Sequence, residues 1–135
     1  MRPLKIPIRS DRKAVKAFLD ELRELLSSKD FNVEEDLLII KSNKSEVQYS
    51  TAYLMTEFEY DAEDIARQIA ELTIHEYSQT LIDEDDDKPP LLYVFGKMLN
   101  GKLVYIKLKI KGDSHRKVLC LSFHFAKYDM DFPYK

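Results

Sequence analysis

Apolar residues in the first part of the chain recur at three- and four-residue steps, which is the spacing of an amphipathic helix. The longest such run covers residues 11–28, and Ser10 is placed to cap its start. A shorter helix is predicted for TAYLMTEFEY, residues 51–60. Between these two helices, the apolar run LLIIK predicts a short strand.

Two capping signals follow. Asp61 can cap a helix over AEDIARQIAEL, whose apolar residues lie on one face. Thr73 and Glu76 then have the T-x-x-E spacing of a capping box, which predicts a further helix over IHEYSQTLI.

After the acidic stretch DEDDDKPP, which is typical of a solvated loop, the apolar period changes to two. The dipeptide Asn100-Gly101 is a strong signal for a two-residue hairpin turn. The predicted strands cover residues 92–99, 102–111 and 117–125. The sequence therefore predicts an α+β fold: an antiparallel meander of three or more strands, with helices packed on one face.

The alternation divides the last two strands into an apolar and a polar face. The apolar face is predicted to hold Val104, Ile106, Leu108, Ile110, Leu119, Leu121, Phe123 and Phe125. The opposite, exposed face would carry Tyr105, Lys107, Lys109, Lys111, Val118, Cys120, Ser122 and His124. The predicted turn places Tyr105 opposite Ser122 and Lys107 opposite Cys120. Gly96 would lie beside Tyr105 and leave room above the sheet for a ligand.

Composition limits the possible classes of protein. A chain of 135 residues is expected to form one domain, residues 1–135. One cysteine excludes an internal disulfide, and three histidines with one cysteine give no zinc-site spacing. Neither a membrane span nor a signal peptide is predicted, which favours the cytoplasm. Charge is uneven: residues 1–87 have 11 Lys/Arg and 21 Asp/Glu, whereas residues 88–135 have 10 and 3.

The polar face combines chemical groups that suit single-stranded RNA. Lysine binds phosphate, and tyrosine stacks a base or contacts phosphate. RNA can be cleaved without a metal or cofactor when its 2′-hydroxyl attacks the adjacent phosphorus, provided that a base and an acid move the protons. His124, with an ordinary pKa near 6.5, can serve either proton role. No metal site or cofactor is predicted.

Several stretches resemble the MqsR family of bacterial toxin–antitoxin ribonucleases, which share the RelE-like fold. YLMTEFEYDAEDIARQIAELTIHEYSQTL is similar to the two-helix segment of the family, and VYIKLKI with VLCLSFH is similar to its closing hairpin. The resemblance covers roughly residues 48–125, and residues 1–47 are an elaborated N-terminal region.

The resemblance implies an endoribonuclease toxin that cleaves mRNA. It implies a cognate antitoxin, of the zinc-binding and helix-turn-helix kind. Tyr105 matches the active-site tyrosine, His124 stands where better-known members have lysine, and Gln79 falls where they have a helical lysine. The catalytic glutamine of the family should fall near Leu91 or Leu92, and neither is polar. The residues predicted to bind RNA are Lys107, Lys109, Lys111 and Ser122.

Other interpretations remain open. The polar face is also compatible with a solvated sheet surface, with a non-catalytic RNA-binding or regulatory module, or with a protein-interaction domain that uses a strand edge. Cys120 is expected to fill space. The tail aromatics Tyr128, Phe132 and Tyr134 are expected to pack against the body of the protein.

Overall fold

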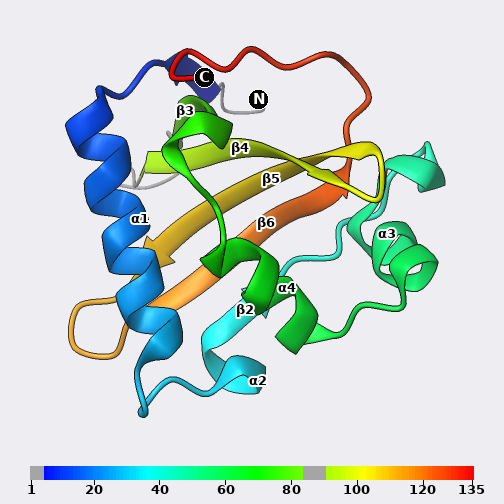
Figure 1. Ribbon diagram of the computed structural model, residues 1–135. Helices are drawn as coiled ribbons and strands as arrows, with labels where there is room; N and C mark the ends of the chain where they lie inside the picture. The colour runs from blue at the N-terminus through cyan, green and yellow to red at the C-terminus, as the bar shows by residue number, and fades with distance from the viewer. Residues whose placement is uncertain (1–4, 84–90) are drawn as a thin grey trace.

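The computed structural model describes residues 5–83 and 91–135, which form an α+β fold built on one six-stranded sheet (Figure 1). The order of strands is β1-β3-β4-β5-β6-β2, antiparallel except for the parallel β2–β6 pair. The elements are β1 (Lys5–Ile8), α1 (Arg12–Ser27), α2 (Val33–Asp36), β2 (Leu37–Ile39), the 3₁₀ turn η1 (Val47–Tyr49), α3 (Thr51–Phe58), α4 (Ala62–Ala70), the 3₁₀ turn η2 (Ile74–Glu76), β3 (Tyr77–Asp83), β4 (Leu91–Leu99), β5 (Lys102–Lys111) and β6 (Lys117–Phe125). Most of the predicted acidic loop, residues 84–90, lies outside the described residues.

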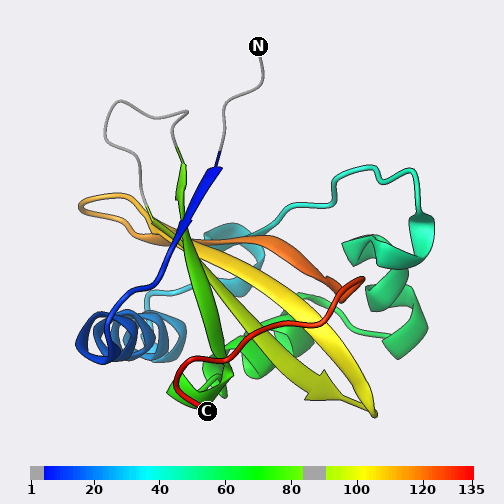
Figure 2. The same ribbon diagram turned by 90° about the horizontal axis from the view of Figure 1, so that it is seen from above.

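Helices α1 and α4 lie on the same side of the sheet (Figures 1 and 2). Their apolar stripes meet the inner sheet face, where the Phe18 ring stacks on Tyr93 with centroids 4.0 Å apart. Ile65 and Ile69 of α4 are fully buried in the same core. Helix α3 contacts β6, where the Phe123 N–H donates to Thr51 Oγ1 at 3.1 Å. The predicted packing of helices on one sheet face is confirmed.

The start of α1 differs from the prediction by one residue. Asp11, not Ser10, is the N-cap, and its carboxylate accepts from the Ala14 N–H at 2.8 Å. Ser10 is buried, and its hydroxyl lies 2.7 Å from Thr80 Oγ1. Because that hydroxyl bonds a neighbouring strand, it does not cap the helix.

The predicted helix over residues 74–82 is wrong. The capping box forms, with the Thr73 N–H donating to Glu76 at 3.0 Å, but it closes only the 3₁₀ turn η2. The chain then continues as strand β3, which lies between β1 and β4. Tyr77 begins this strand and is fully buried, with its ring edge-on to Phe95 at 5.9 Å. Burial of this ring in the core favours the strand over the local helix signal.

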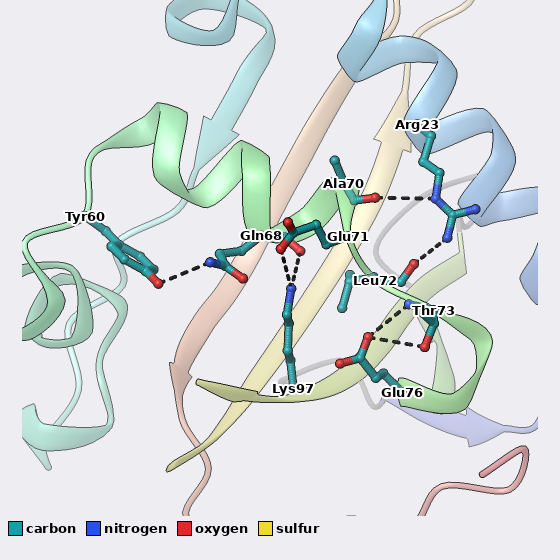
Figure 3. A network of polar contacts seen from close by, with 9 residues as sticks. All are labelled: Arg23, Tyr60, Gln68, Ala70, Glu71, Leu72, Thr73, Glu76 and Lys97. Atoms are coloured by element: carbon teal, nitrogen blue, oxygen red, sulfur yellow. Dashed lines mark hydrogen bonds and ion pairs between the residues drawn. The ribbon is translucent and has the colours of Figure 1, made fainter. Parts of the chain in front are cut away.

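Polar contacts hold the corner between α4 and β3 (Figure 3). Arg23 of α1 donates to the carbonyl oxygens of Ala70 and Leu72. Lys97 of β4 donates to the Gln68 carbonyl at 3.1 Å and contacts the Glu71 carboxylate at 3.3 Å. These bonds satisfy carbonyl groups that the end of a helix leaves without partners.

The meander forms as predicted, but one register differs. Asn100 and Gly101 make the β4–β5 turn, both with positive φ, and Gly96 pairs with Tyr105 as expected. In the β5–β6 pair, however, Tyr105 lies opposite His124, and Lys107 lies opposite Ser122.

Two features together explain this difference: the hairpin pairs Lys111 with Lys117, one residue further along β6 than the predicted turn implies, and a β-bulge adds a second residue. The register shifts between Lys107 and Leu108, so β6 carries one extra residue, Leu121. The hairpin pairing places Val118 and Cys120, predicted to lie on the polar face, in the core with Phe123. The bulge then reverses the alternation, so that Ser122 and His124 lie on the outer face. Leu121 packs on the opposite side of the sheet, so its predicted place on the core face is wrong.

Candidate active-site cleft

The outer face of the sheet, opposite the helices, forms the floor of a cleft of about 700 Å³. Its floor brings together five of the predicted site residues from three strands: Gln79, Tyr105, Lys107, Ser122 and His124. The strands position them because their side chains alternate away from the core. We call this cavity the cleft.

The C-terminal tail, residues 126–135, forms a wall of the cleft. The tail leaves β6 and ends near β1 and the start of α1 (Figures 1 and 2). Phe132 and Met130 lie directly over Gly96, where a β-carbon would be 2.7 Å from Phe132 Cζ and 2.9 Å from Met130 Sδ. The room above Gly96, predicted for a ligand, is therefore occupied by the tail. The outer face is a walled cleft rather than the open polar surface that we expected.

Contacts at residue 134 anchor the end of the tail. The Tyr134 hydroxyl donates to the Ser10 carbonyl at 2.6 Å, and the Tyr134 ring stacks on Tyr77 at 5.8 Å. The Arg12 guanidinium lies 4.9 Å from the centre of the same ring. His75 Nδ1 lies 2.9 Å from the Tyr134 carbonyl oxygen. These contacts hold the tail in place as a wall of the cleft.

Tyr105 and His124 form the central pair of the cleft. They are direct cross-strand partners, and their rings stack with centroids 5.2 Å apart and planes 12° from parallel. Burial raises the pKa of the Tyr105 phenol above its ordinary value. The phenol therefore stays protonated at neutral pH and can donate a hydrogen bond.

The surroundings of His124 favour the neutral form of its imidazole, which can accept a proton. Burial, and to a smaller degree the positive charges of Lys44 and Lys107, lower the pKa of its imidazole; a hydrogen bond to the Phe125 carbonyl opposes this shift. That bond, 3.0 Å long, places the proton of the neutral ring on Nδ1. Nε2 is then the acceptor nitrogen, on a side chain that lines the cleft.

The charged residues that line the cleft are mainly basic. Among the described residues, they are Arg9, Lys44, Lys107 and Lys127, with the carboxylates of Asp129 and Asp131 on the tail. This excess of positive charge favours a polyanionic ligand.

Lys109 and Lys111 lie outside this arrangement. Neither lines the cleft. Lys109 is only 6% exposed, so its predicted place on an open face is wrong. Ser122 lines the cleft but is only 5% exposed. Gln79 reaches the cleft from strand β3, not from a helix as the resemblance implied.

Sequence reasoning missed the parts of the cleft that lie far from the meander. Arg9 follows β1, Lys44 lies in the segment between β2 and η1, and Lys127 lies in the tail. The one available signal was the group of tail aromatics, including Phe132 and Tyr134, which were expected to pack against the body of the protein. Nothing in the local pattern indicates that this tail crosses the outer sheet face.

Cys120 does not line the cleft. Cys120 is fully buried, and burial raises the pKa of its thiol to about 12. Within residues 5–83 and 91–135, no group of three or more His, Cys, Asp or Glu side chains is arranged to hold a metal ion. No helix in that same part of the chain has the length and apolar character needed to cross a membrane.

The chain matches no protein-family model, no curated protein and no solved structure. The structure defines the class of the protein: an α+β protein with a six-stranded, mostly antiparallel sheet and a basic cleft on its outer face.

Proposed function

We propose that the chain is a metal-independent endoribonuclease toxin of the MqsR family, with a RelE-like fold. The observation that carries this proposal is the state of His124: its Nδ1–H is held by the Phe125 carbonyl, and its ring stacks on Tyr105 inside a basic cleft. A neutral imidazole with an acceptor Nε2 can act as the general base that RNA cleavage by the 2′-hydroxyl requires.

In the proposed reaction, His124 Nε2 accepts the proton of the 2′-hydroxyl. The 2′ oxygen forms a bond to the adjacent phosphorus while the bond from phosphorus to the 5′ oxygen breaks. This step leaves a 2′,3′-cyclic phosphate, and the departing 5′ oxygen takes a proton. Tyr105 is our candidate for that acid because its ring, which carries a phenolic hydroxyl, stacks on the ring of the base.

Binding in the cleft would rely on its cations and polar side chains. Lys44 and Lys107 lie close enough to His124 to lower its pKa, so a phosphate near His124 would also be near them. Their positive charge would stabilise the extra negative charge of the phosphorane. Gln79 and Ser122 add polar groups to the floor.

A cognate antitoxin is part of the proposal. Expression of the chain alone in a bacterium should arrest growth, and co-expression of the antitoxin should relieve the arrest. An antitoxin encoded by an adjacent gene would be the partner to test.

The deciding experiment incubates the purified protein with single-stranded RNA in the presence of EDTA. We expect fragments ending in a 2′,3′-cyclic phosphate, and His124→Ala should slow their formation by ~10²–10⁴-fold. His115→Ala is the matched control, since His115 is exposed and lies outside the cleft. Absence of cleavage by the wild-type protein, or equal cleavage by His124→Ala, would reject the assignment. Salt-dependent RNA binding without product would instead favour a non-catalytic RNA-binding module.

A further inference from the structure

A second cavity, of about 420 Å³, opens beside the cleft and is lined by aromatic rings from four separate segments. These rings are Tyr49 of η1, Tyr53 of α3, Phe125 of β6 and Tyr128 of the tail. We call it the aromatic pocket. We propose that the aromatic pocket binds the base of an RNA nucleotide next to the one whose phosphate lies in the cleft. This inference rests on the proposed function, because it takes RNA as the substrate.

The exposure of the tyrosines is the first argument. Tyr128 is 75% exposed and Tyr53 is 36% exposed. We expected Tyr128 to pack against the body of the protein, as Phe132 and Tyr134 do, and this expectation is wrong. A large aromatic side chain left in solvent beside other rings offers a flat surface on which a base can stack.

Positive charge at the rings is the second argument. The Lys127 ammonium lies 5.8 Å from the centre of the Tyr49 ring and 5.7 Å from that of Tyr128. The Lys102 ammonium lies 4.9 Å from the centre of the Phe125 ring. Rings for bases and ammonium groups for phosphates are the two components of sites for single-stranded nucleic acid.

Continuity with the cleft is the third argument. Residues 126–129 line both cavities, so the two lie on either side of the same short segment of the tail. Lys127 faces both and is held at this junction by an ion pair with Glu46. A strand with one phosphate beside His124 can therefore pass Lys127 and place a neighbouring base against Tyr128. Asp129, which also lines both cavities, is the one residue with a carboxylate among the described residues that line the aromatic pocket.

The test measures the binding of 2′-O-methyl oligonucleotides of two, four and six residues, which cannot be cleaved because the 2′-hydroxyl is blocked. In the wild-type protein, affinity should increase stepwise once an oligonucleotide is long enough to reach the aromatic pocket. Tyr128→Ala should remove this step, on the order of tenfold in Kd, whereas Tyr128→Phe should keep it because the ring remains. Leu91→Ala, at an exposed apolar residue that lines neither cavity, is the matched control.

The outcomes separate this inference from the proposed function. An affinity step that depends on length and is lost only when the ring is removed would support the pocket, even if wild-type protein cleaves no RNA. Equal binding by wild type and Tyr128→Ala, no step with length, or no binding of any oligonucleotide would overturn it. Cleavage of long RNA by Tyr128→Ala at the wild-type kcat/KM would overturn it too, while leaving the catalytic assignment intact.

Discussion

Phe132 of the C-terminal tail lies against the backbone of Gly96, so closely that a β-carbon at residue 96 would be 2.7 Å from the tip of its ring. Because residue 96 of β4 has no side chain, the tail can approach the outer face of the sheet. The position of the tail then determines the shape of the cleft.

Gly96→Ala should displace the tail. The new methyl group would overlap Phe132 and Met130, which costs about 1–3 kcal/mol in the free energy of unfolding. Urea denaturation measures this loss, and limited proteolysis should show earlier cleavage within residues 126–135. Gly101→Ala is the control: it has φ +78 but no atom within 4 Å, so it should cost about 1 kcal/mol through backbone strain and leave the tail protected. Equal proteolysis of Gly96→Ala and wild type would contradict the tail contact.

Tyr134→Phe should weaken the anchor of the tail. This change removes the hydrogen bond to the Ser10 carbonyl but keeps the ring stacked on Tyr77, so the free energy of unfolding should fall by about 1 kcal/mol. Tyr128→Phe makes the same chemical change at an exposed ring and should leave stability unchanged. Thermal denaturation of the two variants tests this difference, and equal melting temperatures would argue against the anchor.

The pH dependence of His124 has a definite sign. Its pKa in the folded protein is lowered, first by burial, so below pH 6.5 the unfolded chain binds a proton that the folded chain resists. The contribution to stability is therefore present above pH 6.5 and is lost as the pH falls below it. Titration of the His124 ring protons by NMR should give a pKa below 6.5.

Lys44→Ala offers a second measurement on the same group. The positive charge of Lys44 lowers the pKa of His124, so its removal should move the NMR titration midpoint upward. In the proposed enzyme, the acidic limb of the pH profile for kcat/KM should move in the same direction. Lys135→Ala, at the exposed C-terminus, should leave the midpoint where it is. An unchanged midpoint in Lys44→Ala would contradict the electrostatic coupling.

Cys120 should not react with thiol reagents in the folded protein. Its side chain is fully buried and its thiol pKa is raised to about 12, so almost no thiolate forms at neutral pH. Labelling with a chromogenic disulfide should require denaturant. Rapid labelling in native buffer would show that β6 opens at the bulge.

The sequence by itself determined the elements whose signals are local. Helix α1, helix α4 with its Asp61 cap, and the Asn100-Gly101 hairpin all formed where the pattern predicted them. They could be predicted because capping and turn formation depend on residues within three or four positions. The hairpin also set the pairing of Gly96 with Tyr105, since a two-residue turn determines the register of its own strands.

Tertiary structure alone decided the remaining features. The capping box at Thr73 formed, yet burial of the Tyr77 ring against Tyr93 and Phe95 of β4 made the next segment a strand. The pairing of the β5–β6 hairpin put Cys120 in the core, and the hairpin and the bulge at Leu121 together placed His124 opposite Tyr105. The tail crossed the outer face because Gly96 of β4 leaves space for Phe132 and because the Ser10 carbonyl accepts a hydrogen bond from Tyr134. These outcomes depend on contacts between residues dozens of positions apart, and the local alternation of polar and apolar residues contains no information about them.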